Sequence, residues 1–335
     1  MKTPACFTSS LLRGTLAASL LLTAFVAPAA RAAGPELKLG HVGSPGSLFD
    51  LSAQEYVKRA NEKLGDKAKV VPFGSSQLGD DTEMMQKIKL GTIDMTMPST
   101  VMSTLIPEFG LFEMPYIIKD REHMKRVEKE VVWPKLAPIS EKAGYKILAV
   151  WENGFRQITN NARPVNVPDD LKGMKLRVPK GKWRLKMFQS YGASPSAMGL
   201  SEVFVALQTG VMDGQENPLT QTYASKFQEV QKFLSMTDHV YTPAFLVVSP
   251  SKWAALPADV RKILEDTAKE VQAYVYQTAE QQDKEVLEKI KAGGLKVNTA
   301  NRQAFVDASK TIYDEFTKEV PTGKEMVEKC QALVK

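Results

Sequence analysis

The chain has 335 residues, of which 43% are hydrophobic and 24% are charged. This composition is ordinary for a soluble globular protein, and the length favours two domains over one. There are 44 basic and 38 acidic residues, and this excess is too small and too evenly spread for a nucleic-acid-binding surface. We therefore expect no nucleic-acid partner.

The first 32 residues have the pattern of a secretory signal peptide. A basic start with Lys2 and Arg13 precedes an uncharged apolar run at 15–27, and small residues follow at 30–32 (Ala-Arg-Ala). The apolar run is too short to span a membrane, and no later stretch approaches ~18 uncharged apolar residues. We therefore expect secretion to the periplasm and a soluble mature protein.

Strand and helix patterns alternate at the start of the mature chain. In chain order they are a strand at 36–42, a helix at 49–64, a strand at 68–73, a helix at 80–91 and a strand at 93–97. This order predicts a parallel sheet with helices on both faces. Such sheets bind ligands at the carboxyl ends of their strands, where we expect the loops 43–46, 74–79 and 98–103 to gather.

The longest periodic pattern is a helix at 257–292. At 1.5 Å per residue it would measure roughly 54 Å, which exceeds the ~30 Å width of a small domain. We expect it to span two lobes, because no proline or glycine interrupts it after its first residue. A coiled-coil arm is disfavoured, since glutamines at 272, 277, 281 and 282 dilute any heptad seam. Further strands are expected at 145–151 and 240–248, and further helices at 183–191 and 201–209.

Two arginines lie on short strand-like runs in the middle of the chain. Arg156 is in NGFRQITN (153–160), and Arg177 is in KLRVP (175–179). A guanidinium is a planar fork that matches a carboxylate with two parallel hydrogen bonds, and in a cleft it requires an anion. Strand alternation alone favours a plainer interpretation, in which Arg177 lies on the solvent face of a half-buried strand.

The neighbours of these arginines allow both structural and functional interpretations. The polar segment 213–218 (DGQENP) is expected to form a turn, with Asp213 and Glu216 as turn and capping residues. The cations of 180–186 are expected on the solvated face of a helix; they are Lys180, Lys182, Arg184 and Lys186. The apolar side chains near the arginines fit a pocket lining and core packing equally well; they are Trp151, Phe155, Trp183 and Leu200.

Several longer phrases carry a resemblance to a known family. They are GSSQLGDD (74–81), KLGTIDM (89–95), NGFRQITN, LKGMKLRVP (171–179), GASPSAMGLSEVFVALQTG (192–210), DGQENP and FQEVQKFLSMT (227–237). From about residue 37 to the C-terminal helices, the chain resembles the extracytoplasmic solute-binding subunits of tripartite ATP-independent periplasmic (TRAP) transporters. The resemblance implies an α/β fold of two lobes, each a mixed, mostly parallel sheet flanked by helices, with a long helix spanning both. We place lobe I at 33–153 and 243–282, and lobe II at 154–242 and 283–335.

The resemblance also assigns site residues. It implies that Arg177 holds the substrate carboxylate and that Arg156 and Asn217 make further polar contacts. The first lobe is expected to add Asp80, Ser99 and the loop 43–46, while Phe155, Trp183 and Leu200 are candidate lining residues. The sialate-binding branch of the family has a glutamate where this chain has Ser99 and a phenylalanine where it has Leu200, which counts against sialate as the ligand.

We therefore expect a monomeric periplasmic protein that captures an organic acid, closes around it and delivers it to one small and one large membrane subunit. No cofactor or metal is expected, since the three histidines share no metal-ligand spacing and the chain has no P-loop. A binding protein of an ATP-driven importer and a periplasmic enzyme acting on a carboxylic acid are the alternatives. If Met198, Trp151 and the apolar candidates line the pocket, a 2-oxo or 2-hydroxy monocarboxylate should bind better than a sugar acid.

Overall fold

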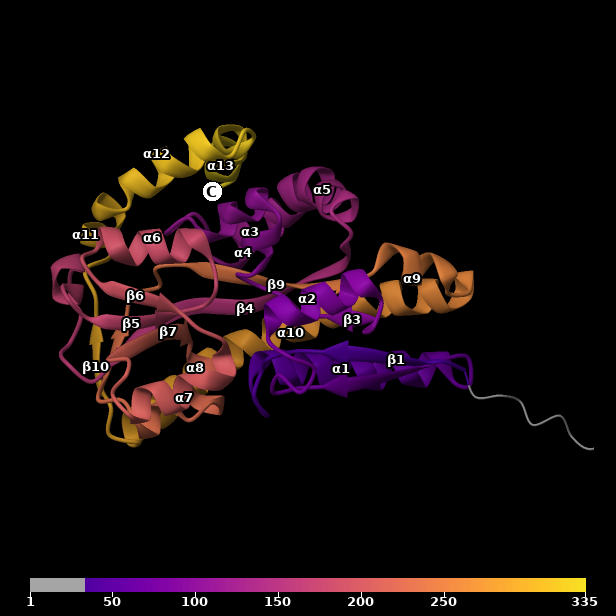
Figure 1. Cartoon of the computed structure of the whole chain (residues 1–335), viewed down its shortest axis with the longest axis horizontal. Coiled ribbons are helices and arrows are strands. Elements are labelled where there is room, and N and C mark those ends of the chain that lie inside the picture. The colour runs from indigo at the N-terminus through magenta and orange to yellow at the C-terminus, as the bar shows by residue number, and fades with distance from the viewer. Residues whose placement is uncertain (1–33) are drawn as a thin grey trace, which may run out of the picture. The chain divides into compact units, whose positions relative to one another are not determined.

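The computed structural model describes residues 34–335, and the expected signal peptide at 1–32 lies outside them (Figure 1). The strands of this part are β1 (Glu36–Gly40), β2 (Lys69–Phe73), β3 (Met95–Thr96), β4 (Lys146–Asn160), β5 (Lys175–Val178), β6 (Ser194–Ala197), β7 (Gly214–Pro218), β8 (Phe233–Met236), β9 (Tyr241–Val248) and β10 (Lys296–Thr299). The helices up to the middle of the chain are α1 (Leu48–Leu64), α2 (Asp81–Leu90), α3 (Met102–Leu105), α4 (Arg121–Val127), α5 (Ala137–Lys142), α6 (Lys182–Ser190), α7 (Leu200–Gln208) and α8 (Leu219–Ala224). They are followed by α9 (Pro250–Ala255), α10 (Ala258–Ala292), α11 (Arg302–Ala308), α12 (Lys310–Glu319) and α13 (Gly323–Ala332).

The strands pair in the order β2-β1-β3-β9-β4-β7-β5-β6, while β8 pairs with both β4 and β10. The pairs β1–β2 and β1–β3 are parallel, as the opening strand-helix alternation predicts. The pairs β5–β6 and β5–β7 form a second parallel set. Antiparallel pairing through β9 and β4 joins the two sets. The result is the mixed, mostly parallel arrangement that the resemblance implies.

The 15-residue strand β4 belongs to both halves of the molecule. Its first ten residues pair with β9, and its last five pair with β7. The register shifts between Glu152 and Gly154, and Gly154 has a φ of 119°, which favours glycine. A β-carbon at Gly154 would also lie 3.3 Å from the Pro218 side chain. The chain therefore passes between the halves through an irregular strand rather than through a linker.

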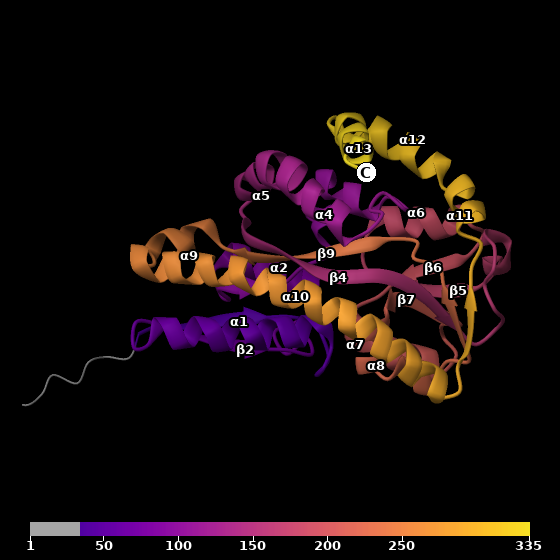
Figure 2. The same cartoon turned by 180° about the vertical axis from the view of Figure 1, so that it is seen from behind.

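Helix α10 confirms the predicted long helix and packs against both halves (Figure 2). Along its first half, Leu264 and Val271 join the core formed with α1, β1 and β2. Near its end, Val286 and Ile290 pack with Leu219 of α8 and with β8. Among residues 34–335, neither this helix nor any other combines the length and apolarity needed to cross a membrane.

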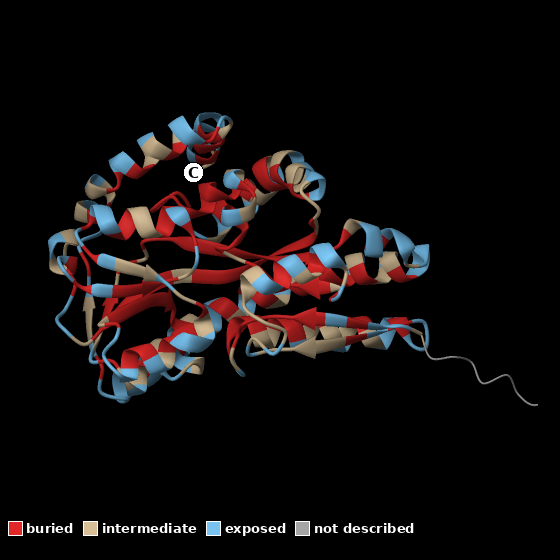
Figure 3. Cartoon of the chain, in the orientation of Figure 1, coloured by how far each residue is buried: buried red, intermediate tan, exposed pale blue. Residues whose placement is uncertain are grey.

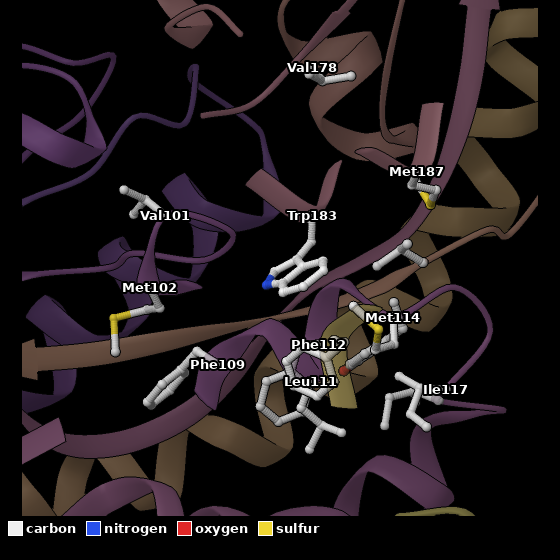
Figure 4. Close-up of a cluster of buried hydrophobic side chains, with 14 of the residues drawn as sticks. Val101, Met102, Phe109, Leu111, Phe112, Met114, Ile117, Val178, Trp183 and Met187 are labelled. Carbon is white, nitrogen blue, oxygen red and sulfur yellow. The ribbon is translucent and has the colours of Figure 1, made fainter. Parts of the chain in front are cut away.

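Buried residues gather on the strands and on the helix faces that cover them (Figure 3). The largest core cluster joins α6 to the 3₁₀ turn η1 (Pro107–Glu113) and to the C-terminal helices. Trp183 of α6 and Phe109 and Phe112 of η1 all belong to this cluster (Figure 4), and the Trp183 ring meets the Phe316 ring edge-on at 5.3 Å. The 3₁₀ segment η1 therefore packs against α6. The two segments together surround the buried charges described below.

Candidate functional site

A pocket lies where the ends of β1, β3 and β5 meet the beginnings of α2, α7 and α8. This position follows the rule that parallel sheets bind ligands at the carboxyl ends of their strands. The pocket brings together six of the predicted site residues, namely Arg177, Arg156, Asn217, Asp80, Ser99 and Leu200. Its other lining residues are Val42, Phe49, Asp81, Thr82, Thr100, Val101, Asn153, Pro179, Lys180, Met198, Gly199 and Gln221.

Arg177 is buried, with only 3% of the residue exposed. Its Nε and Nη2 donate to the Met198 carbonyl oxygen at 3.0 and 2.6 Å. Within residues 34–335, no carboxylate forms an ion pair with it. Burial lowers the pKa of Arg177 to about 9, despite the nearby charge of Glu216. The carbonyl fixes the orientation of the fork and leaves its positive charge without a partner.

Arg156 is equally buried but has a counter-charge. Its Nε donates to Glu216 Oε2 at 2.5 Å, and its Nη2 donates to Glu216 Oε1 and Asn217 Oδ1 at 3.1 Å each. Asn217 Nδ2 in turn donates to Gln215 Oε1 at 2.6 Å. The expected turn at 213–218 is therefore wrong: residues 214–218 form the buried strand β7, which pairs with β4 and carries Glu216 beside Arg156.

Glu216 is the centre of a buried ionic network. It also accepts from Arg184 Nη1 at 2.7 Å and from His239 Nε2 at 3.0 Å. Burial alone would raise the pKa of Glu216, but the charges of Arg156 and Arg184 outweigh this effect and hold it well below its usual range. Burial lowers the pKa of His239, so the ring is neutral, donates from Nε2 and accepts at Nδ1 from the Thr237 hydroxyl at 2.8 Å.

The prediction that Arg184 lies on a solvated helix face is wrong. Arg184 is fully buried, and its Nη2 lies 2.9 Å from Oε2 of the equally buried Glu113, at an angle that falls short of a hydrogen bond. The reason is helical spacing, which places Arg184 on the same inward face of α6 as Met187 and Phe188. Lys182 and Lys186 lie on the outward face and pair with acids of α12.

The buried arginines of this network differ in their ion pairs. Among residues 34–335, Glu113 and Glu216 form ion pairs with Arg156 and Arg184. Arg177 has the Asp81 carboxyl group nearby but no carboxylate of this part of the chain within ion-pair distance. Of the three guanidiniums, that of Arg177 on the wall of the pocket is therefore the one without an ion pair in the described chain.

The beginning of α2 contributes two carboxyl groups to the pocket lining, those of Asp80 and Asp81. Asp80 caps the helix, since its side chain accepts from the Glu83 amide at 3.0 Å, and its Oδ2 accepts from Lys180 Nζ at 2.6 Å. Sequence reasoning treated Asp81 only as a first-turn acid, although it lines the pocket and its buried Oδ1 has no hydrogen-bond partner in the described chain. Burial, reinforced by the charge of Asp80, raises the pKa of Asp81 to about 7.

Other polar groups complete the lining. Ser99 Oγ donates to the Pro243 carbonyl at 2.7 Å, and Asn153 Nδ2 donates to Thr242 Oγ1 at 3.1 Å. Two further buried acceptors of the pocket, Thr100 Oγ1 and Gln221 Oε1, have no hydrogen-bond partner among residues 34–335. Sequence reasoning missed Asn153 and Gln221, although Asn153 opens the same phrase as Arg156.

The structure does not bring the expected aromatic side chains to the pocket. Phe155 packs edge-on against Tyr241 at 4.9 Å, on the opposite face of β4 from Arg156, as the two-residue period of a strand requires. Trp183 belongs to the core beneath α6. Trp151 is also a core residue, and its Nε1 donates to the Ala268 carbonyl of α10 at 2.9 Å. The loop 43–46 is likewise absent from the pocket lining.

An α/β fold with a pocket at the strand ends, lined by a guanidinium that has no ion pair among the described residues, is typical of periplasmic solute-binding proteins. The chain belongs to the bacterial extracellular solute-binding proteins, family 7, whose sequence pattern matches residues 39–319. Members of this family bind solutes and are not enzymes. The alternative of an enzyme acting on a carboxylic acid is therefore wrong.

Relatives of known structure or function cover almost the whole described chain. A sialic acid-binding periplasmic protein of Vibrio cholerae is 35% identical over 299 residues, or 89% of this chain and 92% of the relative. A TRAP periplasmic solute-binding protein of Sulfurospirillum deleyianum, solved with bound succinate, gives a TM-score of 0.85 at 33% identity and covers 90% of this chain and 100% of that one. Another TRAP periplasmic solute-binding protein, from a Polaromonas species and bound to D-erythronate, gives a TM-score of 0.85 at 31% identity. The match covers 89% of this chain and 98% of that one. These likenesses confirm the predicted family and its two-lobed α/β fold.

Proposed function

We propose that this protein is the periplasmic subunit of a TRAP transporter and captures a small hydroxylated monocarboxylate through Arg177. The observation that carries the proposal is the buried positive charge of Arg177, which forms no ion pair with a carboxylate of the described chain. An uncompensated buried charge is costly, and a ligand carboxylate would supply the missing partner. One guanidinium without an ion pair in the described chain fits one carboxylate.

The orientation of the guanidinium suggests how the carboxylate is held. The Met198 carbonyl occupies the side of the fork formed by Nε and one N–H of Nη2. The remaining N–H groups of Nη1 and Nη2 form the end of the fork, which can bind both carboxylate oxygens. We therefore assign Arg177 to the carboxylate, and Arg156 and Asn217 to an oxygen on the neighbouring carbon.

The unpartnered acceptors of the pocket favour a ligand with hydroxyl groups. Asp81 Oδ1, Gln221 Oε1 and Thr100 Oγ1 are buried acceptors without a donor from residues 34–335. A hydroxylated ligand could donate to them, whereas an apolar tail would leave them unsatisfied. The expectation of a 2-oxo or 2-hydroxy acid with an apolar tail relies on Trp151, Phe155, Trp183, Leu200 and Met198 as lining residues. The three aromatic residues lie outside the pocket, whereas Leu200 and Met198 line it.

We further propose that closure of two lobes around the ligand transmits binding to the membrane subunits. The lobes would be 33–153 with 243–282, and 154–242 with 283–335. Asp80 and Ser99 belong to the first lobe, while Arg177 and Asn217 belong to the second, so one ligand would contact both. The match to TRAP proteins supports small and large membrane subunits as partners over an ATP-driven importer, and the periplasmic names of relatives support secretion of this chain.

A thermal-shift panel on the mature protein tests this proposal. D-Erythronate, D-gluconate, 2-oxobutyrate, succinate and sialate are compared at equal concentration, and a ligand at 100 times its Kd should stabilise the fold by about 2.7 kcal/mol. We expect one of the small hydroxylated monocarboxylates, D-erythronate or D-gluconate, to give the largest shift. A larger shift with 2-oxobutyrate or succinate would contradict the assignment of the acceptors.

Calorimetry on Arg177→Lys tests the carboxylate contact. Lysine keeps the charge but not the fork, so the best ligand of the panel should lose about 2–5 kcal/mol of binding free energy. Leu200→Met is the matched control, because it alters the lining and no hydrogen bond. An affinity within about threefold of the original protein would remove Arg177 from its role.

A further inference from the structure

A second cation reaches the pocket wall but is already paired. Lys180 follows β5 two residues beyond Val178 and lines the pocket together with Arg156 and Arg177. Its Nζ lies 2.6 Å from Asp80 Oδ2, and its side chain is 46% exposed. Arg156 is bound by Glu216, so only Arg177 among these three cations has no carboxylate partner in the described chain.

The position of Asp80 is fixed independently of Lys180. Its Oδ1 accepts from the Glu83 amide at 3.0 Å, and Glu83 Oε2 accepts from the Asp80 amide at 2.9 Å. This reciprocal cap holds the Asp80 side chain at the start of α2 and leaves Oδ2 directed at Lys180. The hydrogen bond from Lys180 and its charge lower the pKa of Asp80 even though partial burial opposes them, so the carboxylate is ionised.

We propose that Asp80 determines the charge selectivity of the pocket by neutralising Lys180, so that the site accepts monocarboxylates and disfavours dicarboxylates. This inference rests on the proposed function, in which Arg177 holds one carboxylate of the ligand. Asp80 then acts as the counter-ion of a lining lysine rather than as a direct ligand contact. The charge of Asp80, and not the presence of Lys180 alone, decides whether a second carboxylate has a partner.

The physical reason is competition between carboxylates. A second ligand carboxylate on the Lys180 side of the pocket would meet the Asp80 carboxylate, which already occupies the ammonium group. Asp81, the next residue, adds a further acid on the same wall. Like charges at this separation repel, and the dicarboxylate would lose water without gaining an ion pair. Removal of the Asp80 charge would release Lys180 for the ligand.

Asp80→Asn tests the inference without damaging the helix, because asparagine caps helices as well as aspartate does. The ligands form matched pairs: meso-tartrate is D-erythronate with its terminal hydroxymethyl group replaced by a carboxylate, and D-glucarate is related to D-gluconate in the same way. Calorimetry at pH 6 keeps Asp81 mostly protonated, given its pKa of about 7. In Asp80→Asn, the affinity ratio of diacid to monoacid should rise about fivefold, the upper range for a half-exposed ion pair.

Two further variants separate a local effect from a general one. In the double variant Asp80→Asn with Lys180→Gln, the gain for the diacids should disappear. Asp94→Asn removes an equal charge from a pair with Lys252 outside the pocket, at 3.1 Å, and should leave the ratio unchanged. An unchanged ratio in Asp80→Asn, or a gain that persists in the double variant, would overturn the inference.

The same measurements distinguish failure of the inference from failure of the proposed function. If Arg177→Lys abolishes monoacid binding and Asp80→Asn leaves the ratio unchanged, only the role of Asp80 is wrong. If Arg177→Lys binds the monoacids as the original protein does, the carboxylate contact itself is wrong. A protein that binds none of the four acids contradicts both.

Discussion

Arg156 and Arg177 lie in one pocket and are buried to the same degree, yet they are held in different ways. Arg156, on β4, is bound by the carboxylate of Glu216, which Arg184 and His239 also contact. Among the described residues, the side chain of Arg177, on β5, donates hydrogen bonds only to the Met198 carbonyl. A carbonyl orients a guanidinium but does not neutralise it. The comparison shows that two equally buried arginines of one pocket differ in charge compensation: Glu216 pairs with Arg156, and no carboxylate of the described chain pairs with Arg177.

The largest expected effect is a change in folding stability when the ion pairs of Glu216 are broken. Glu216→Gln should lower the free energy of unfolding by about 3–5 kcal/mol, because it leaves the buried charges of Arg156 and Arg184 short of a partner. Arg177→Met should leave the free energy of unfolding unchanged or raise it, because it removes a charge that has no partner. Urea denaturation without ligand measures both. Equal destabilisation by the two variants would show that Arg177 is also structural.

A smaller effect is expected in the pH dependence of ligand affinity, which we attribute to Asp81. Its pKa of about 7 means that it ionises near neutrality, and a bound anion beside Arg177 would raise this pKa further. Binding should therefore take up a proton, so affinity for a monocarboxylate falls as pH rises above 7. Between pH 7 and 8.5 the loss should approach tenfold, and in Asp81→Asn the profile should be flat.

Calorimetry from pH 6 to 8.5 checks this prediction. The Asp81→Asn variant also serves as the control for the other titrating groups, because it retains all of them. Parallel pH profiles in the two proteins would show that Asp81 does not respond to the ligand charge.

The smallest effect on ligand affinity is expected for a substitution of Phe155, the residue before Arg156. Phe155→Leu should change ligand affinity by less than about twofold, because Phe155 faces Tyr241 on the opposite side of β4. Leu200→Ala, which alters the lining itself, should weaken binding by more. Calorimetry on both variants tests the assignment of the two faces. A loss in Phe155→Leu as large as in Leu200→Ala would indicate that the strand faces are misassigned.

Periodic patterns predicted much of the fold. The alternating start and the helix at 257–292 follow from residue spacing, and the family phrases directed attention to Arg156, Arg177 and Asn217, which line one pocket. The segment 213–218 was mispredicted because Asp-Gly and Asn-Pro are strong turn signals, while pairing with β4 is a long-range interaction that overrides them.

The buried network could not be predicted from local sequence. Arg184 has lysines two residues before and two after it, so it resembles a solvated face until the contact with Glu113, 71 positions earlier in the chain, is known. Helical spacing with Met187 and Phe188 was a usable signal for its burial. For Phe155, the two-residue period already excluded it from the face of Arg156.

A crystal structure with bound D-erythronate tests the assignment of Arg177 to the ligand carboxylate. We expect one carboxylate at the end of the Arg177 fork, with oxygen atoms about 2.7–2.9 Å from Nη1 and Nη2. We also expect hydroxyl groups within hydrogen-bond distance of Asp81 and Gln221, and an intact pair of Asp80 with Lys180. A carboxylate bound at Lys180, with Arg177 still contacting only Met198, would contradict this assignment.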